Sequence, residues 1–427
     1  MRILFRHIKS LIGIGQPAAP LRGAGLANLP QLHNAWLLIE GERIVAFGAE
    51  TGLSEGDLSQ GDLLQADLPP ADRIISCEGR YILPAFCDSH THMVFAGSRE
   101  SEFVDKIRGL SYAEIAAKGG GIHSSARRLA ATPFEQLFRE SLKKLEKITA
   151  SGTGAIEIKS GYGLTVDAEL KMLSVIKALK QHSPVPIKAT FLGAHAIPPE
   201  YASDREAYIR LIIDEMLPVI QQEQLADYID VFCENGFFSP DETIRICEAG
   251  KKFGLIPKIH ANQLHVSGGV QAGIAAGALS VDHLESMDQE AIDALAKSDT
   301  IGTLLPTAAY FLRMQPPPAR ALIEAGAAIA LATDYNPGSS PAYRMSAVVS
   351  MACIQMKMVP EEAINAATIN GAFAMGLEQK LGSIYPGKLA NLIITEPIPS
   401  LAYLPYSFGE SSIAQVYVKG LPVNSIR

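Results

Sequence analysis

The chain has 427 residues, of which 48% are hydrophobic and 19% are charged, and its formal net charge at pH 7 is −8. This composition supplies enough apolar side chains for a large core and excludes a disordered chain, while the acidic balance argues against a broad nucleic-acid-binding face. The five cysteines form no C-x-x-C pair, which predicts reduced thiols in a cytoplasmic protein rather than a disulfide scaffold.

The N-terminal residues mix Arg6, His7 and Lys9 with Leu and Ile, so a secretory signal peptide has to be considered. The polar residues interrupt the apolar stretch and no small-residue cleavage site follows, which argues against that interpretation. No window approaches the roughly 20 apolar residues needed to cross a bilayer, so we expect no membrane-spanning segment.

Both ends of the chain show short strand patterns. Residues 36–47 predict two strands joined by a turn at 41–42, and residues 388–394 and 415–423 have the same character. Residues 50–72 are rich in Gly, Asp, Pro and Ser, which predicts a loop. Strands confined to the two termini favour one small β domain that both chain ends build together.

Between the termini, short apolar runs alternate with helical patterns. The runs that suit buried parallel strands cover residues 82–87, 155–158, 187–192, 228–232, 257–259, 279–281, 301–305 and 328–332. Apolar residues at helical spacing predict a helix over 134–148, opened by a capping box at Thr132 with Pro133 at N1, and Ser239 repeats this device. Eight such units fit a (β/α)8 barrel.

We therefore predict an α/β protein with two domains. Residues 85–382 would form a (β/α)8 TIM-like barrel, and residues 1–84 and 383–427 a small, discontinuous β-sandwich domain built from both termini. An open doubly wound sheet is the alternative, which is weakened because no Gly-x-Gly-x-x-Gly follows a predicted strand.

Polar residues follow several of the predicted barrel strands. His90 and His92 follow the first strand, and they point to the same side because side chains alternate along an extended segment. His260, His283 and Asp334 end the fifth, sixth and eighth strands. A lone histidine at a strand end is more often structural, but the C-terminal strand ends of a barrel converge on one face. Imidazoles with a carboxylate suit Zn²⁺ or a similar ion, so the combination predicts a metal site.

Two nearby residues receive a different interpretation. His265 follows His260 closely, but we expect it on a helix surface. Lys159 ends the second predicted strand and is interpreted as a structural or pocket-wall charge.

Several segments carry a resemblance over nearly the whole chain, and they are residues 88–99, 119–122, 157–164, 191–199, 258–263, 280–285 and 332–340. The chain resembles the amidohydrolase superfamily and, within it, the imidazolonepropionase family of histidine degradation. The Ser-Gly-Tyr-Gly stretch at 160–163 and the Asn-Pro-Gly-Ser stretch at 336–339 are specific to that family. The sequence departs from the usual pattern at Ala85, where Gly is usual, and at Tyr335, where Phe is common.

The resemblance implies one divalent or trivalent metal ion per subunit, Zn or Fe, and four ligands: His90, His92, His260 and Asp334. Water activated there would attack the ring carbonyl of a cyclic amide. Asp334 would accept the proton and pass it to the leaving ring nitrogen, His283 would hydrogen-bond the water or the oxyanion, and Gln263 would hydrogen-bond the ring. Binuclear relatives carry a carbamylated Lys at the end of the fourth strand, where residues 231–234 contain none.

The same resemblance implies the substrate 4-imidazolone-5-propanoate and the product N-formimidoyl-L-glutamate. Arg99 would bind the carboxylate arm, assisted by the hydroxyl of Tyr162, while His195 would face the ring. The product would be cradled partly by backbone N–H groups of a loop that contains Asn336, Gly338 and Ser339. Residues 119–121 are interpreted as a flexible lid or a loop that shapes the substrate site.

The expected partner is thus a small molecule with a carboxylate arm, without nucleic acid or membrane, and the family suggests a homodimer. Two alternatives remain open. One is another cyclic-amide hydrolase or a deaminase of the same superfamily. The other is a non-catalytic assembly protein of the same fold, which would be expected to lack some of the metal ligands.

Overall fold

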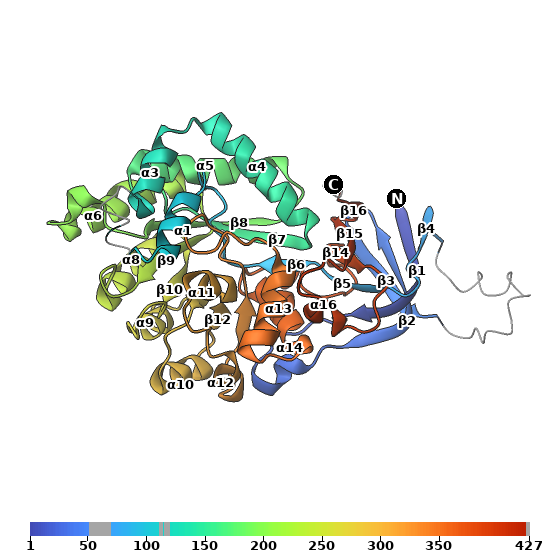
Figure 1. Cartoon of the computed structure of the whole chain (residues 1–427). Helices are drawn as coiled ribbons and strands as arrows, with labels where there is room; N and C mark the ends of the chain where they lie inside the picture. The colour runs from blue at the N-terminus through green and yellow to red at the C-terminus, as the bar shows by residue number, and fades with distance from the viewer. Residues whose placement is uncertain (51–69, 111–113, 115–119, 424–427) are drawn as a thin grey trace, which may run out of the picture.

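The computed structural model of the chain describes residues 1–50, 70–110, 114 and 120–423. A barrel of parallel strands surrounded by helices lies beside a mixed sheet that contains both chain ends (Figure 1). Most of the loop predicted at 50–72 lies outside the described residues.

Within the described residues, eight parallel strands form the barrel sheet in sequence order. They are β6 (Phe86–Asp88), β7 (Thr153–Lys159), β8 (Ile187–Ala194), β9 (Tyr228–Cys233), β10 (Ile256–Ala261), β11 (Ser280–His283), β12 (Ile301–Leu304) and β13 (Ile329–Leu331). Past the ends of β13 and β6, Asp334 N donates to His90 O at 3.0 Å and His92 N donates to Tyr335 O at 2.9 Å. These bonds join the last segment to the first, as in a barrel, and the predicted (β/α)8 fold is confirmed.

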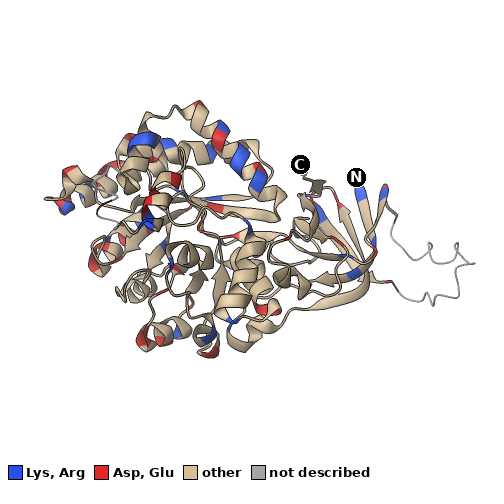
Figure 2. Cartoon of the chain, in the orientation of Figure 1, with Lys and Arg blue, Asp and Glu red and all other residues tan. Residues whose placement is uncertain are grey.

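Helices of the barrel pack their apolar faces on the strands and turn charged residues of both signs outward (Figure 2). The α-helices are α1 (Glu100–Ile107), α3 (Gly121–Ala131), α4 (Phe134–Ala150), α5 (Val166–His182), α6 (Arg205–Arg210), α7 (Leu217–Gln222), α8 (Pro240–Lys252), α9 (Gly269–Ala275), α10 (Gln289–Lys297), α11 (Pro306–Leu312), α12 (Ala319–Glu324), α13 (Met345–Met356), α14 (Pro360–Ala367), α15 (Ile369–Phe373) and α16 (Tyr403–Tyr406). Short η segments are η1 (Gly23–Ala27), η2 (Pro199–Tyr201) and the π-type η3 (Leu211–Met216).

The two predicted capping boxes differ in outcome. At α8, Ser239 Oγ accepts from Glu242 N at 3.2 Å and Ser239 N donates to Glu242 Oε2 at 2.8 Å, so this box is confirmed. The box predicted at Thr132 is wrong. The Thr132 hydroxyl donates to the carbonyl of Arg128 at 2.8 Å and so caps the end of α3, and Pro133 is the N-cap of α4.

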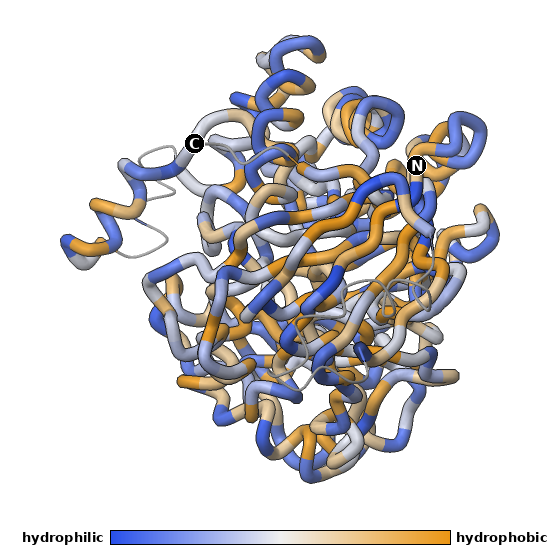
Figure 3. Tube along the Cα trace, turned by 90° about the vertical axis from the view of Figure 1, so that its right-hand side faces the viewer, coloured by the Kyte–Doolittle hydropathy of each residue, from blue (hydrophilic) through white to orange (hydrophobic). Residues whose placement is uncertain are grey.

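The second sheet combines the two chain ends, in the strand order β16-β15-β14-β5-β1-β2-β3, with β4 paired to β1. Its strands are β1 (Arg2–Ile12), β2 (Gln31–Glu40), β3 (Arg43–Ala49), β4 (Arg73–Ser76), β5 (Tyr81–Pro84), β14 (Leu392–Thr395), β15 (Ile413–Val418) and β16 (Leu421–Pro422). The predicted turn at 41–42 joins β2 and β3. Figure 3 turns this sheet toward the viewer and shows the hydrophobic stretches of its strands.

The segment considered as a signal peptide is β1, an inner strand of this sheet. Ile3, Leu4 and Phe5 are consecutive and all buried, so the strand is covered on both faces and lacks the simple alternation of a surface strand. No helix in the described part of the chain is long and apolar enough to span a membrane.

The two sheets meet at Ala85, which separates β5 from β6 and so divides the strand predicted over 82–87. Ala85 N donates to Asn391 O at 2.9 Å, and the Asn391 side chain donates to Gly154 O of β7 at 2.7 Å. A Cβ at Gly154 would lie 2.4 Å from the Ala85 Cβ, so the glycine permits this close approach. The terminal sheet thereby fixes the start of β6, the strand that leads into His90 and His92.

Candidate metal and substrate site

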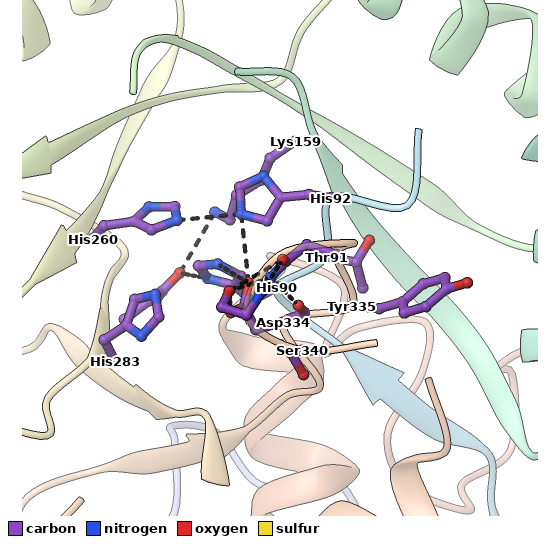
Figure 4. A network of polar contacts seen from close by, with 12 residues as sticks. His90, Thr91, His92, Lys159, His260, His283, Asp334, Tyr335 and Ser340 are labelled. Carbon is purple, nitrogen blue, oxygen red and sulfur yellow. Dashed lines mark hydrogen bonds and ion pairs between the residues drawn. The ribbon is translucent and has the colours of Figure 1, made fainter. Parts of the chain in front are cut away.

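Five side chains meet at the C-terminal ends of the barrel strands (Figure 4). His90 and His92 follow β6, His260 lies near the end of β10, His283 ends β11, and Asp334 follows β13. All five are buried. The structure therefore brings together the residues that the strand-end pattern predicted to converge.

Three distances between their ligand atoms match the spacing that a small cation requires. His90 Nε2 is 3.5 Å and His92 Nε2 is 3.6 Å from Asp334 Oδ1, while His260 Nε2 is 3.3 Å from His92 Nε2. Tetrahedral ligation at about 2.1 Å places ligand atoms about 3.4 Å apart, which agrees with these distances. The buried His90 Nε2 has no hydrogen-bond partner among the described residues. This donor set fits a Zn- or Fe-type ion.

Hydrogen bonds on the far side of each ring turn Nε2 toward the centre. His90 Nδ1 donates to Asp282 Oδ2 at 2.7 Å and His260 Nδ1 donates to Asp230 Oδ2 at 2.9 Å. His92 Nδ1 makes a longer contact of 3.4 Å with the backbone carbonyl of Ser160. A proton held on Nδ1 leaves the lone pair of Nε2 free for a metal ion.

The backbone turns sharply at two of the five residues. His283 has φ 89° and Asp334 has φ 51°, both in the left-handed region of backbone conformation that residues other than glycine seldom adopt. Asp334 is held there by its N–H bond to His90 O. Such conformations often occur at functional sites, where the surrounding structure maintains them.

Burial and neighbouring charges set the protonation of the cluster. Burial lowers the pKa of His90, His92 and His260 well below the usual value, so these rings are neutral. Burial raises the pKa of Asp334 to about 7, while the charge of His283 acts against this shift, as a bound cation also would. Burial opposes protonation of His283 itself, but the Glu285 carboxylate, 3.3 Å from its Nδ1, raises the pKa above the ordinary value.

A second group of side chains extends from the histidines to Arg99. The ring of His92 lies 5.5 Å from His195 and 5.8 Å from Tyr162, centroid to centroid. The Arg99 guanidinium lies 5.7 Å from the centre of the Tyr162 ring, and its Nε donates to Ser125 Oγ at 2.8 Å. Arg99 Nη2 is buried and has no hydrogen-bond partner among the described residues.

The loop after β13 is a preformed turn. Asn336 Oδ1 accepts from the backbone N–H groups of Gly338 and Ser339, both at 2.8 Å, and its amide donates to Asp334 O at 2.7 Å. Ser339 Oγ donates to Asp334 Oδ2 at 3.3 Å. These N–H groups, which were expected to cradle the product, therefore bind the Asn336 side chain in the structure.

Other sequence-based expectations have separate outcomes. Gln263 follows β10 and is buried. His265 is not on a helix as expected, because it lies in the exposed loop between β10 and α9, where its Nδ1 donates to Glu234 at 3.1 Å. Lys159 is fully buried and binds carboxylates rather than lining a pocket. Gly119 lies outside the described residues, and Gly121 begins α3.

Comparison with known proteins places the chain in a family. The model of the "Amidohydrolase family" matches residues 81–423. The imidazolonepropionase of Flavobacterium johnsoniae is 52% identical over 421 residues, covering 98% of this chain and 99% of the relative, and that of Geobacillus kaustophilus is 42% identical over 98% of this chain and 97% of the relative. The chain belongs to the imidazolonepropionase family.

Solved structures outside this family share the fold. The guanine deaminase of E. coli has a TM-score of 0.71 at 15% identity, with 99% of each chain covered. A zinc-containing adenosine deaminase from Xanthomonas campestris has a TM-score of 0.68 at 17% identity, covering 98% of this chain and 92% of the other. At these identities the likeness shows the (β/α)8 architecture, and the resemblance noted in the sequence is confirmed at the level of the family.

Sequence analysis missed the carboxylates that orient the histidines in this imidazolonepropionase family member. Asp230 and Asp282 lie inside β9 and β11, and Glu157 lies inside β7. A signal was present, because a charged residue inside an otherwise apolar buried strand needs a partner. Searching the predicted strands for such residues would have found Glu157 and Asp230, whereas Asp282 lies one residue past the strand predicted at 279–281.

Proposed function

We propose that the chain catalyses the hydrolytic opening of 4-imidazolone-5-propanoate to N-formimidoyl-L-glutamate in histidine degradation. Near-full-length relatives at 38–52% identity carry the name imidazolonepropionase, which supports a hydrolase acting on a carbon–nitrogen bond. The observation that carries the proposal is the line of contacts from His92 through Tyr162 to Arg99. It places an unpaired guanidinium N–H beside the histidine cluster, as a ring with a carboxylate arm requires.

In this proposal, His90, His92, His260 and Asp334 hold one Zn or Fe ion per subunit. The convergent Nε2 atoms and their carboxylate-bound Nδ1 atoms support this ligand set. A bound ion of this kind lowers the pKa of water and polarises a carbonyl oxygen. Lys159 is already engaged by carboxylates, which supports one metal ion rather than two.

Asp334 and His283 then handle the proton and the developing charge. Asp334 Oδ1 faces the histidine Nε2 atoms, where it accepts the proton of the attacking water and passes it to the leaving ring nitrogen. Ser339 Oγ holds the other oxygen, Oδ2, in place. His283, with Nδ1 directed at Glu285, presents its other nitrogen to the water or the oxyanion.

Residues further from the strand ends orient the substrate. Arg99 binds the carboxylate arm through its guanidinium, with the Tyr162 hydroxyl beside it. His195 Nδ1 donates to Gly161 O at 2.9 Å, so its opposite ring nitrogen is directed at the substrate ring, and Gln263 hydrogen-bonds that ring from the loop after β10. Gly338, Ser339 and the turn built by Asn336 close the side nearest Arg99.

A substrate panel tests the proposal. Purified enzyme is given 4-imidazolone-5-propanoate, a neutral imidazolone without the arm, a hydantoin, guanine and adenosine, while ultraviolet absorbance, released ammonia and product mass are followed. We expect ring opening of the carboxylate-bearing substrate with the mass of N-formimidoyl-glutamate. Arg99→Ala should raise KM for this substrate by about 10- to 100-fold, the effect of losing a charge-assisted hydrogen bond.

Arg139→Ala, at an exposed arginine on α4, is the matched control and should behave as the wild type. Ammonia release from a purine, or preferential opening of a neutral ring, would contradict the proposed substrate. Equal losses with charged and neutral imidazolones in Arg99→Ala would remove Arg99 from the carboxylate-binding role.

A further inference from the structure

Lys159 is one of the largest fully buried side chains among the described residues, and Figure 4 shows it next to His92 in the network that contains the histidine cluster. Its ammonium contacts three buried carboxylates: Glu157 Oε1 at 2.6 Å, Asp230 Oδ2 at 2.8 Å and Asp282 Oδ2 at 3.5 Å. A buried ammonium is stable only when it is paired in this way. Of the three carboxylates, Glu157 also pairs with the buried ammonium of Lys258.

Two of the three oxygen atoms that Lys159 contacts also bind proposed metal ligands. Asp230 Oδ2 also accepts from His260 Nδ1 at 2.9 Å, and Asp282 Oδ2 also accepts from His90 Nδ1 at 2.7 Å. The Lys159 ammonium therefore contacts the same carboxylate oxygens that accept the hydrogen bonds orienting two imidazoles from different strands.

The backbone of Lys159 contacts the segment that carries His90 and His92. Lys159 N donates to Thr91 O at 2.8 Å, and Thr91 lies between His90 and His92. The Thr91 hydroxyl also donates to Glu157 O at 2.6 Å. The segment that carries both histidines is thus tied to the end of β7.

The other oxygens of Asp282 and Asp230 are bound by other donors. Ser280 Oγ donates to Asp282 Oδ1 at 2.6 Å and His260 N donates to Asp230 Oδ1 at 3.1 Å. Asp282 and Asp230 therefore each have one oxygen bound by another donor and one shared between Lys159 and a histidine. Removal of the ammonium would take one of the two partners from each shared oxygen.

We infer that Lys159 is a positioning residue, which sets the orientation of His90 and His260 together through Asp282 and Asp230 and thereby raises the affinity of the site for its metal ion. The inference rests on the metal site of the proposed function. It assigns to this lysine a role in metal binding through other residues, without contact with substrate.

The direction in which metal affinity changes when Lys159 is removed distinguishes a positioning role from a purely electrostatic one. A buried ammonium repels a nearby metal cation, so if Lys159 acted only through its charge, its removal would tighten metal binding. If Lys159 holds the carboxylates that orient the ligands, its removal weakens binding. Loss of such partners behind a metal ligand typically lowers metal affinity by about 10- to 100-fold.

The test measures metal affinity directly. Wild-type protein and Lys159→Met are stripped of metal, and Zn²⁺ binding is measured by competition with a chromogenic chelator, with the visible spectrum of the Co²⁺-loaded protein as a second readout. We expect Lys159→Met to bind Zn²⁺ about 10- to 100-fold more weakly and to show an altered Co²⁺ spectrum. Wild-type or tighter affinity with an unchanged spectrum would overturn the inference.

Lys388→Met is the matched control for loss of a buried lysine. The Lys388 ammonium donates to Leu381 O at 3.1 Å and Ser383 Oγ at 2.7 Å, away from the histidines, so this variant should keep wild-type Zn²⁺ affinity whatever its thermal stability. Loss of metal affinity in Lys388→Met equal to that in Lys159→Met would attribute the effect to general destabilisation and overturn the inference.

Asp230→Asn and the double variant Lys159→Met/Asp230→Asn complete a double-mutant cycle with Lys159→Met. The double variant removes one positive and one negative charge together, so it can still be measured if Lys159→Met alone fails to fold. The double variant should bind Zn²⁺ more weakly than Asp230→Asn, because the link through Asp282 is lost as well. Equal affinities of these two variants would overturn the inference. Wild-type protein that binds no metal ion would instead contradict the metal site of the proposed function.

Discussion

The guanidinium of Arg99 is held by three neighbours that come from different parts of the chain. Ser125 accepts from its Nε, the Tyr162 ring lies beneath it, and Gly338 leaves room for Nη1. A Cβ at position 338 would lie 2.4 Å from Nη1 and 3.2 Å from Cζ of Arg99. The glycine therefore matters for the space it leaves, in addition to its place in the turn.

Gly338→Ala should displace Arg99 and weaken binding of the carboxylate arm. Because a charge-assisted hydrogen bond contributes about 1.5–3 kcal/mol, we expect KM for 4-imidazolone-5-propanoate to rise about 10-fold or more, with a smaller change in kcat. Steady-state kinetics followed by ultraviolet absorbance measure both constants. Gly25→Ala is the control, since a Cβ there meets no atom within 4 Å, and an unchanged KM in Gly338→Ala would show that Arg99 does not need this space.

For single residues, the sequence indicated which side chains lie at the strand ends, but not which residues contact the side chains of the site. His260, His283 and Asp334 could be found because a barrel brings the C-terminal ends of its strands together. Ser125 could not, because its contact with Arg99 depends on how α3 packs over the segment after His92. Such a contact between distant segments leaves no periodic pattern in the sequence.

Among the elements, the loop between β7 and α5 is organised by one buried carboxylate. Glu169 of α5 accepts from Gly163 N at 2.6 Å and from Gly161 N and Leu164 N at 3.0 Å each. Tyr162 is part of this loop, and the carbonyl of Gly161 accepts from His195 Nδ1. One side chain thus positions two proposed substrate contacts.

Glu169→Gln should loosen this loop, because the amide NH2 faces backbone N–H groups that need an acceptor. We expect the free energy of unfolding to fall by about 1–3 kcal/mol, as for a buried donor left unpaired, and KM to rise because Tyr162 and His195 shift. Urea unfolding and kinetics provide the two readouts. Asp167→Asn, an exposed change in the first turn of the same helix, should alter stability by no more than about 0.5 kcal/mol; equal effects of the two variants would contradict the role given to Glu169.

Prediction of the elements succeeded where burial produced a regular pattern. Seven of the eight barrel strands were predicted within a few residues of their observed bounds, because each is a short apolar run between turns. The run at 82–87 failed because β5 and β6 are separated by a single residue, although they belong to different sheets. Hydrophobicity is continuous there, and only the hydrogen bonds to Asn391 and Gly152 mark the change.

In the whole molecule, the terminal sheet and the barrel are connected at the strand that carries the site. β14 pairs with β5 in the terminal sheet, and the adjoining Asn391 binds both Ala85 and Gly154. The predicted association of the two chain ends in one sheet is confirmed, whereas the limits of 85–382 for the catalytic domain stay a prediction. The pairing of chain ends follows from similar strand patterns at both termini, but the order of the strands could not be predicted from them.

The barrel as a whole brings four proposed metal ligands, at or just past the ends of β6, β10 and β13, to one point. A single measurement addresses this claim: protein stripped of metal is titrated with Zn²⁺ while the opening of 4-imidazolone-5-propanoate is followed by ultraviolet absorbance. We predict no turnover without metal and a rate that rises linearly until one ion is bound per chain. Turnover by the metal-free protein, or a rate that rises until two ions are bound per chain, would contradict the account.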